Sequence, residues 1–326
     1  MQGSDKPAPR RPGTIIEDDD HSLAIRAAWA HYVGGMTQAA VAKQLGIPSV
    51  KAHRLIARAV AEGAVKVSID GAIVSCLELG AQLAARYGLD VCEIAPDLGE
   101  TGLPLRALSQ MGASYLRRQI EMQAHPIIGI GHGRTLAGAV RALPRFELQG
   151  QRFVSLLGGL TRNFAANPHD VMHLLAEKTG AQAHVMPVPF FANTIEDRHV
   201  LLSQRGVSDV FAMAQAAPLK IVGVGTVSAQ TQLVMSGMIE PQEINAIAHA
   251  GAVGELLGHF FDAHGRLLET PLSDRTISIG VDGGGTRSVV ALAGGAEKVA
   301  PLRAVLLSGR LAGLITDERT ARALLE

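Results

Sequence analysis

The sequence predicts an α/β protein in which an N-terminal helix-turn-helix DNA-binding domain precedes a large, doubly wound, mostly parallel sheet. Three observations lead to this prediction. Short apolar segments alternate with amphipathic helices from residue 90 onward, which is typical of a sheet covered on both faces. A basic three-helix pattern occupies residues 22–66. The composition, with 47% apolar residues, 4% aromatic residues and 36 glycines, suits packing through small aliphatic side chains, and 326 residues leave room for two domains.

The chain begins with a proline-rich segment that ends in the acidic run Glu17 to Asp20. We expect residues 1–20 to be a disordered tail, because such a composition buries little apolar surface. A first helix is predicted over residues 23–33, where apolar residues repeat at three- and four-residue spacing, and Gly34-Gly35 ends it.

A short second helix and a turn follow. Thr37 is placed to cap a helix from Gln38 to Leu45. Gly46 suits the left-handed residue that closes it, and Ile47 offers an apolar plug. Pro48 suits the first turn of a third helix, because its missing N–H needs no partner there.

The third helix, residues 49–61, is predicted to enter the DNA major groove. One side of this helix is basic, and the other side is apolar and is formed by Leu55, Ile56 and Val60. Residues 22–66 hold six Lys or Arg and one acid, a net charge of +5 within a chain of net charge zero. Local positive charge is what phosphate contact requires, although an ordinary three-helix segment with a solvated basic face is the alternative. The candidate DNA-binding residues are Thr37, Gln38, Ser49, Lys51, His53, Arg54 and Arg58.

A short strand with alternating apolar residues is predicted at 66–69, where it could form the wing of the DNA-binding domain. The turn pair Asp70-Gly71 follows, so we place a domain boundary near residue 70. We therefore assign residues 21–70 to the DNA-binding domain and 71–326 to an effector-binding and oligomerisation domain. A helix from Cys76 to Tyr87 leads into the second domain.

The remaining elements alternate between strand and helix. The predicted strands are Val91–Ala95, Ile127–Ile130, Phe153–Leu157, Ala183–Met186, Ile221–Val224, Val289–Ala293 and Gly313–Thr316. The predicted helices are Leu105–Ile120, Leu136–Leu143, Val171–Thr179, Val200–Arg205, Val207–Ala214 and Glu297–Leu307.

Glycine-rich loops follow several of these strands, at the sheet edge where α/β proteins bind ligands. In such loops the backbone can approach an anion, and the following helix adds its dipole. Arg134, Thr135 and Lys298 would add donors. The candidate effector-binding residues from these loops are Gly131, Gly133, Arg134, Thr135, Gly158, Gly159, Gly225, Gly295 and Lys298.

The chain resembles the SorC family of sugar-responsive bacterial transcription regulators, also called the sugar-binding DeoR-like group. The resemblance covers residue 22 to the end. Its motifs are Gly35-Met36-Thr37-Gln38, Leu45-Gly46-Ile47, Gly131-x-Gly133-Arg134-Thr135-Leu136, Gly251-Ala252-Val253-Gly254, Phe260-Phe261-Asp262-x-x-Gly265, Ala293-Gly294-Gly295-x-x-Lys298 and Ile315-Thr316-Asp317-Glu318. Residues 27–38 also resemble polyol regulators of the erythritol type.

The resemblance implies an effector domain related to sugar-phosphate isomerases and deaminases, usually without catalysis. It implies binding of double-stranded operator DNA, a sugar, polyol or sugar-phosphate effector, and assembly as homodimers or homotetramers. Arg134, Thr135, Glu255 and Lys298 match ligand-contacting positions of the family, and Asp262 belongs to its Phe-Phe-Asp motif. The chain departs from the family at Pro48-Ser49-Val50-Lys51, at His132 and at Glu255, so neither the operator sequence nor the effector is transferable.

Two other functions stay open at this point. A sugar-phosphate isomerase or deaminase would use Lys298 or Lys220 for a Schiff base and Glu255 or Asp262 as a general base. A DNA-binding protein whose large domain only oligomerises would bind no effector.

Several other patterns carry less weight. The kinase-like motif Val281 to Arg287 has too few residues after it for a nucleotide cleft, and His169/His173 lack a third ligand. We expect no metal, no cofactor and no catalytic residue. The absence of a long apolar run or a leader, with only two cysteines, favours a cytoplasmic protein without a membrane span.

Overall fold

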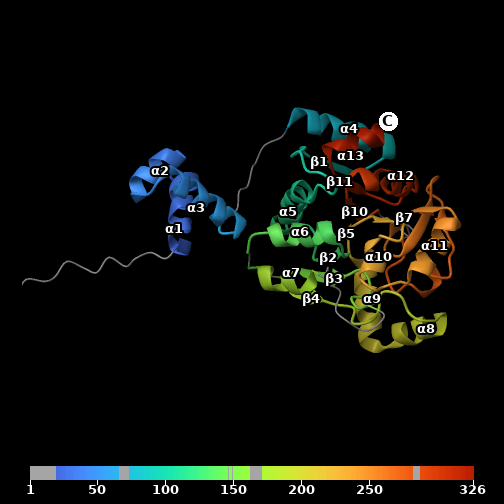
Figure 1. Ribbon diagram of the computed structural model, residues 1–326. Helices are drawn as coiled ribbons and strands as arrows, with labels where there is room; N and C mark the ends of the chain where they lie inside the picture. The colour runs from blue at the N-terminus through green and yellow to red at the C-terminus, as the bar shows by residue number, and fades with distance from the viewer. Residues whose placement is uncertain (1–19, 66–72, 146, 149, 162–170, 282–286) are drawn as a thin grey trace, which may run out of the picture. The chain divides into compact units, whose positions relative to one another are not determined.

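The computed structural model describes residues 20–65, 73–145, 147–148, 150–161, 171–281 and 287–326 (Figure 1). The chain divides into two compact units, Met1–Gly71 and Ala72–Glu326. Residues 1–19 of the predicted tail, the predicted strand at 66–69, His169 and most of the kinase-like motif lie outside the described residues. The last residue of the predicted tail, Asp20, is instead the first residue of a helix.

The first unit is a small helical domain. Its elements are α1 (Asp20–Ala28), the π-helical turn η1 (Trp29–Val33), α2 (Gln38–Leu45) and α3 (Ser49–Ala61). Their core is made of small side chains from α1 packed against Val41, Leu55 and Ile56. Alanine allows these short helices to approach closely, which compensates for the limited area that such a small unit can bury.

Two features predicted around α2, its capping threonine and its closing glycine, are present. The Thr37 hydroxyl accepts a hydrogen bond from the Ala40 N–H at 3.2 Å and so caps α2. Gly46 is left-handed, with φ of 63°. Pro48 differs from the prediction, because it takes the extended N-cap position and α3 begins at Ser49. Val60 also differs, since it is exposed rather than in the core.

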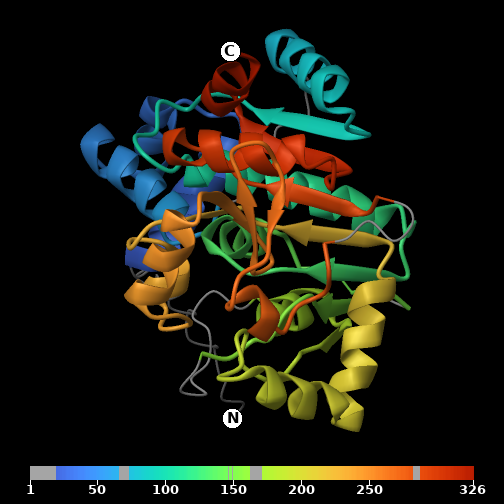
Figure 2. The same ribbon diagram turned by 90° about the vertical axis from the view of Figure 1, so that its right-hand side faces the viewer.

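The second unit is built on a seven-stranded parallel sheet, whose strands follow one another from top to bottom in Figure 2. Their order is β1-β11-β10-β5-β2-β3-β4. The strands are β1 (Val91–Ala95), β2 (Ile127–Ile130), β3 (Arg152–Ser155), β4 (Gln182–His184), β5 (Leu219–Val222), β10 (Val289–Leu292) and β11 (Gly313–Asp317). Every predicted strand is present, within one or two residues of its predicted position.

Helices cover both faces of this sheet, as predicted. One face packs against α5 (Leu105–Glu121), α6 (Arg134–Ala142) and α7 (Met172–Thr179). The other packs against α4 (Val74–Tyr87), α9 (Arg205–Ala216), α12 (Val299–Leu307) and α13 (Glu318–Leu325). Because side chains alternate along a strand, Ile315 of β11 packs with α5, α6 and α7. Its neighbour Leu314 packs with the helices on the other face. The strands therefore read as continuous apolar runs.

A second, antiparallel sheet of four strands was not predicted. It runs in the order β6-β7-β8-β9, formed by β6 (Gly225–Thr226), β7 (Ala252–Leu256), β8 (His259–Asp262) and β9 (Leu267–Leu268). Its fully buried Phe260 and Phe261 join the same core as α12. Leu257 and Gly258 turn the chain between β7 and β8 with φ of 51° and 78°. A leucine is an unusual residue in such a turn, so the sequence carried no hairpin signal.

The helix predicted at Val200–Arg205 was placed too late. α8 (Ile195–Ser203) begins after Thr194, whose hydroxyl accepts from the Asp197 N–H at 3.0 Å. The remaining short elements are α10 (Gln232–Met235), α11 (Pro241–His249), η2 (Ser273–Arg275) and η3 (Ala296–Lys298).

Candidate functional site

The sheet topology creates a crevice between β2 and β5. These strands are neighbours, but the chain leaves β2 toward β3 and β4 on one side and leaves β5 toward β10 and β11 on the other. Ligands of open α/β sheets bind outside the carboxyl ends of strands at such a switch point. A pocket of about 620 Å³ lies there, lined by the loops after β2, β5 and β10 and by β7. This volume suits a small organic ligand.

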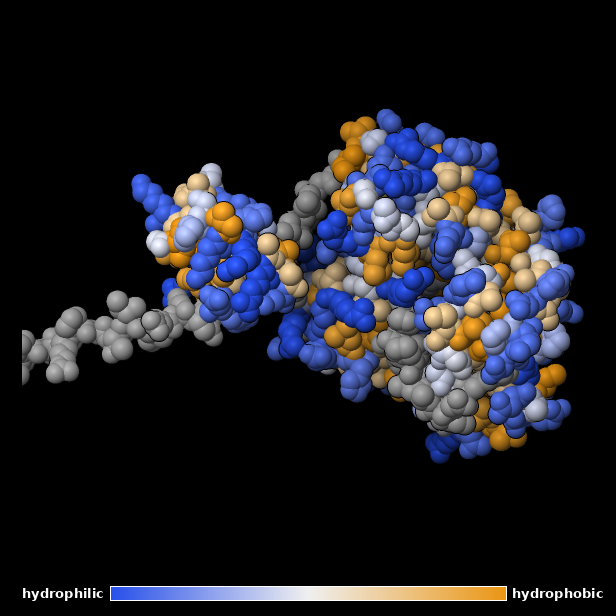
Figure 3. Space-filling view, viewed as in Figure 1, coloured by the Kyte–Doolittle hydropathy of each residue, from blue (hydrophilic) through white to orange (hydrophobic). Residues whose placement is uncertain are grey.

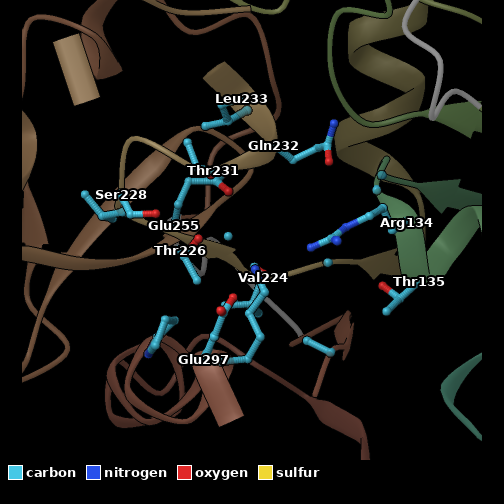
Figure 4. A pocket seen from close by; sticks show the side chains of 18 of the residues that line it. Arg134, Thr135, Val224, Thr226, Ser228, Thr231, Gln232, Leu233, Glu255 and Glu297 are labelled. Carbon is cyan, nitrogen blue, oxygen red and sulfur yellow. Dashed lines mark hydrogen bonds between the residues drawn. The ribbon is translucent and has the colours of Figure 1, made fainter. Parts of the chain in front are cut away.

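The loop after β2 supplies one wall of the pocket (Figure 4). Gly133 has φ of 130° and precedes the first residue of α6, a backbone conformation that L side chains rarely adopt. Arg134 is exposed at the start of α6. The Thr135 hydroxyl is buried and donates to the Leu292 carbonyl at 3.0 Å. Four of the candidate effector-binding residues, Gly131, Gly133, Arg134 and Thr135, line the pocket.

Glu255 and Lys298 both line the pocket. The Lys298 ammonium donates to the Val224 carbonyl at 2.7 Å, which joins the loops after β10 and β5. One oxygen of Glu255 accepts from the Gly258 N–H at 2.5 Å. The other lies against Gly225, where a Cβ would stand 2.0 Å from it. Gly225 therefore makes room for a buried carboxylate.

Burial dominates the ionisation of this pair. It raises the pKa of the Glu255 carboxyl above its usual 4.5, although the Gly258 N–H and Lys298 both act to lower that pKa. Burial likewise lowers the pKa of Lys298; Glu255 then raises it and Arg134 lowers it. Lys298 therefore interacts electrostatically with both Glu255 and Arg134.

The buried Glu255 carboxyl makes a testable contribution to pH dependence. Because its folded pKa is raised, the native chain keeps a proton that the unfolded chain loses above about pH 4.5. The free energy of unfolding should therefore fall as pH rises from that value through the folded pKa. Glu255→Gln cannot ionise and should flatten this part of the profile. Urea denaturation of both proteins at pH 5 and pH 8, followed by circular dichroism, measures the difference, and identical profiles would refute it.

The loop after β10 is held by a residue that the predictions did not include. Asp317, at the end of β11, accepts from the Gly295 N–H at 3.0 Å and from the Thr320 hydroxyl at 2.6 Å. A Cβ on Gly294 would stand 2.1 Å from the same carboxylate. Asp317 thus fixes the turn that carries Lys298 into the pocket. Gly294 lines the pocket, whereas Gly295 does not.

Three further predicted residues lie outside the pocket lining. Gly158 and Gly159 bond through their N–H groups to the carbonyls of Ile277 at 2.9 Å and Met186 at 3.0 Å. A Cβ on Gly158 would stand 2.3 Å from the Pro189 carbonyl oxygen, so this glycine allows two loops to pack closely. The Asp262 carboxylate accepts from the N–H groups of His264 and Arg266, both at 2.9 Å, and from the Arg266 guanidinium at 2.7 Å. It therefore stabilises the turn after β8, and the geometry does not place it against effector hydroxyls.

Polar side chains form much of the remaining lining, and the sequence analysis did not find them. Across the pocket from Arg134 in Figure 4 lie Ser228 and Thr231, close to the labelled Thr226. The polar lining residues missed by the predictions are His132, Thr226, Ser228, Gln230, Thr231, Gln232 and Glu297. The available signal was the polar run directly after Gly225 at the end of a buried strand. Hydroxyl and amide groups can bond the alcohol groups of a small sugar or polyol.

In the first unit, α3 carries the predicted DNA-binding residues on its solvent side. Ser49, His53, Arg54 and Arg58 are exposed, and Lys51 lies 3.6 Å from the Asp20 carboxylate. His53 pairs with the Gln38 side-chain oxygen at 3.1 Å, which brings two of the predicted residues together.

The basic residues of α3 differ in whether they form ion pairs with other residues of the protein. Arg58 forms an ion pair with Glu62 at 2.6 Å, so it is held away from the start of the helix. Within the described residues, Arg54 makes no hydrogen bond or ion pair with the protein. Arg54 is therefore the α3 side chain best placed to reach a base or phosphate.

Lys220, one of the two lysines that an isomerase or deaminase could use for a Schiff base, lies outside the pocket. Lys220 is near the start of β5, and its ammonium donates to the Ala217 carbonyl at 2.6 Å and the Ser288 hydroxyl at 2.9 Å. The pocket is at the opposite end of this strand. Among the described residues, no group of His, Cys, Asp or Glu could hold a metal ion, and no helix is long and apolar enough to cross a membrane.

Comparison with known proteins relates this geometry to a family. Residues 72–326 match the family model Sugar-bind, described as "Putative sugar-binding domain". The chain is 66% identical over 310 residues to the erythritol catabolism regulatory protein EryD of Brucella abortus (strain 2308), across 95% of this chain and 98% of that protein. It is 29% identical over 322 residues to the transcriptional regulator LsrR of Klebsiella pneumoniae, across 97% and 96% of the two chains.

A solved structure shows the same relationship. The full-length sorbitol operon regulator SorC from Klebsiella pneumoniae matches with a TM-score of 0.69 and 25% identity, covering 95% of this chain and 100% of that one. The resemblance to the SorC family stated from the motifs is thereby confirmed. The relatives are transcription regulators and not isomerases or deaminases. The chain therefore belongs to the sugar-binding family of SorC- and DeoR-type transcription regulators, and it is not an enzyme.

Proposed function

We propose that the first unit binds double-stranded operator DNA through α3 and that an effector in the pocket controls this binding. The observation that carries the proposal is the pocket itself. It combines the cations Arg134 and Lys298 with a wall of hydroxyl and amide groups at the sheet's switch point. The two cations suit a phosphate, and the polar wall suits the alcohol groups of a sugar or polyol. A regulator of operator DNA acts in the cytoplasm.

The effector we propose is a small polyol or its phosphate. The name of the Brucella abortus relative refers to erythritol catabolism. The polar wall matches that chemistry, because each alcohol group needs a hydrogen-bonding partner once it is buried. Whether the effector carries a phosphate decides how much Arg134 and Lys298 contribute.

The experiment is a melting-temperature screen of the full-length chain with erythritol, sorbitol, their monophosphates and inorganic phosphate. A ligand that binds only the folded state raises the melting temperature in proportion to the logarithm of its concentration. A shift with a polyol phosphate that exceeds the shift with inorganic phosphate is the expected result. If neither polyols nor their phosphates change the melting temperature, the pocket is not the effector site.

We also expect the chain to assemble as at least a dimer. A single helix-turn-helix contacts one half-site, and specific affinity usually requires two half-sites related by the symmetry of the protein. Sedimentation at micromolar concentration should give at least twice the 34.2 kDa of one chain. A monomer, both with and without DNA, would contradict this expectation.

A further inference from the structure

Helix α13 is bonded to a pocket loop at one end and to α4 at the other. It has eight residues and therefore spans about 12 Å. α4 is the first helix after the DNA-binding unit in the sequence, because that unit ends at Gly71 and α4 begins at Val74. The two helices lie side by side and pack in one hydrophobic core (Figures 1 and 2). α13 therefore connects the pocket with the part of the second unit that the chain enters first.

The N-terminal end of α13 holds the pocket loop after β10. Asp317 caps the helix, since its carboxylate accepts from the Thr320 N–H at 3.0 Å. The Gly295 N–H donates to both the Asp317 carboxylate and the Thr320 hydroxyl, at 3.0 Å and 2.7 Å. The Gly295 carbonyl in turn accepts from the Lys298 N–H at 2.9 Å. The residues that begin α13 thus also hold the backbone that carries Lys298.

A second pocket loop, the one after β1, is bonded to the same end of α13. The Arg319 guanidinium donates to the Asp97 carboxylate at 2.7 Å, and the Asp97 N–H donates to the Glu318 carboxylate at 3.3 Å. This loop continues to Leu103, which lines the pocket. The start of α13 therefore contacts two of the loops that a ligand would touch.

The C-terminal end of α13 is held by the last turn of α4. The final carbonyls of a helix have no partner within the helix itself. Here the Leu324 carbonyl accepts from the Tyr87 hydroxyl at 3.1 Å, and the Leu325 carbonyl accepts from the Arg86 guanidinium. Tyr87 and Arg86 are the last two residues of α4. Side chains of α4 thus bond directly to the end of α13.

The start of α4 is the least covered part of that helix. Val74 is 68% exposed and Leu77 is 60% exposed. Figure 3 shows hydrophobic surface, coloured orange, over this end of α4. The buried residues Leu79 and Leu83 lie further along, where α4 packs against β1 and α13. Of these two neighbours, β1 is fixed by pairing with β11 along all five of its residues, whereas α13 is bonded to pocket loops.

We propose that an effector in the pocket acts on the DNA-binding unit by shifting α13, which moves α4. The proposal rests on the proposed function and names the route by which the effector regulates the DNA-binding unit. A ligand bonded by the Lys298 ammonium shifts the turn from Gly295 to Lys298. The two acceptors at the start of α13 carry this shift into the helix, and the bonds from Arg86 and Tyr87 carry it into α4. Rigid elements and hydrogen-bond networks of this kind transmit coupling between distant sites.

The double variant Arg86→Met/Tyr87→Phe removes the α4 end of this link. It keeps most of the apolar volume of both side chains and changes no pocket residue. The full-length chain selects its preferred duplex from a random-sequence pool. The probes are erythritol, sorbitol and their monophosphates, and the one that raises the wild-type melting temperature most is used at saturation.

The expected result is loss of regulation without loss of binding. The probe should change duplex affinity by about fivefold to 150-fold in the wild type and by less than about twofold in the double variant. Calorimetry without DNA should give the double variant the same probe affinity as the wild type. Because coupling is reciprocal, the duplex should also change probe affinity in the wild type and not in the double variant.

Two control variants remove the same chemical groups elsewhere. Tyr115→Phe removes a hydroxyl from the core on the other face of the sheet, and Arg145→Met removes a guanidinium that pairs with Glu177. Both should respond to the probe like the wild type. If they lose the response as well, its loss in the double variant is not specific to the link, and the proposal is overturned.

Asp317→Asn tests the pocket end of the link. If its oxygen keeps the Thr320 N–H, its amide group places a donor against the donors of Gly295 and Thr320. Probe binding should weaken severalfold, and at saturation the duplex response should fall as in the double variant. Circular dichroism establishes that each variant is folded. A response of wild-type size in either folded variant would overturn the link.

The wild type distinguishes this failure from failure of the proposed function. If the probe binds the wild type and changes its duplex affinity, and the double variant responds equally, the link alone is wrong. If no probe binds the wild type, or a bound probe leaves duplex affinity unchanged, the proposed function is wrong and the link falls with it.

Discussion

Replacing Lys298 with methionine should remove the effector's influence on operator binding while leaving operator affinity without effector nearly unchanged. Lys298 lines the pocket of the second unit, and α3 is in the first. An effector changes DNA affinity only through unequal binding to two protein states, by about 1–3 kcal/mol in typical coupled systems. Loss of effector binding therefore removes the response. Operator titrations with and without effector measure both quantities.

The chemistry of the effector sets the size of the loss. A charge-assisted hydrogen bond is worth about 1.5–3 kcal/mol, so a phosphorylated ligand should lose affinity by about tenfold to 150-fold. An unphosphorylated polyol should lose much less. The controls must allow for Glu255, because removal of Lys298 takes away the cation that acts to lower the pKa of this buried carboxyl. The double variant Lys298→Met/Glu255→Gln removes both charges and separates lost ligand contact from lost stability. Lost DNA binding with an intact effector response would show that the sensor lies elsewhere.

Replacing Arg54 with alanine should weaken operator binding by about 1–3 kcal/mol if the guanidinium bonds a base through two donors. Arg54 is exposed in the N-terminal half of α3, the half of a recognition helix that meets base edges. The matched control is Arg58→Ala, because the Arg58 guanidinium is already bound to Glu62 at 2.6 Å and should contribute less.

Salt dependence identifies the kind of contact that Arg54 makes. Loss of a phosphate contact lowers the salt slope by about one and weakens binding to all sequences alike. Loss of a base contact relaxes specificity at one position. The placement of α3 in the groove would be wrong if Arg54→Ala and Lys51→Ala both bind the operator as tightly as the wild-type chain.

The main sheet could be predicted because its strands are short apolar runs buried on both faces. β1 and β2 were predicted at the residues where they occur, since turn residues bound them on each side. The second sheet was missed because β7 contains both Gly254 and Glu255 and turns through Leu257. Its stability comes from packing against the core of the main sheet, which is not visible in local sequence.

The sequence predicted the pocket loops in which the backbone geometry requires glycine. It did not predict the side chains that form the rest of the pocket lining. Gly133, with its φ of 130°, belongs to a recognisable loop. Ser228 and Thr231 belong to no such pattern. The sequence could not show that Asp262 lies outside the pocket lining, because a carboxylate that stabilises a turn and one that binds a ligand have the same sequence appearance. Only the three donors around Asp262 distinguish them.

The contact between Gly225 and Glu255 restricts how effector specificity can change. A methyl group at position 225 would stand 2.0 Å from the Glu255 carboxylate, so a larger residue there requires a shorter one at 255. A shorter residue at 255 alone leaves a void beside Gly225 and withdraws the acceptor of the Gly258 N–H. Each single substitution should destabilise this contact, and the larger residue at 225 should be tolerated only together with the shorter one at 255. The two positions are therefore epistatic, and a library that randomises the pocket one residue at a time will discard variants that only simultaneous changes can reach.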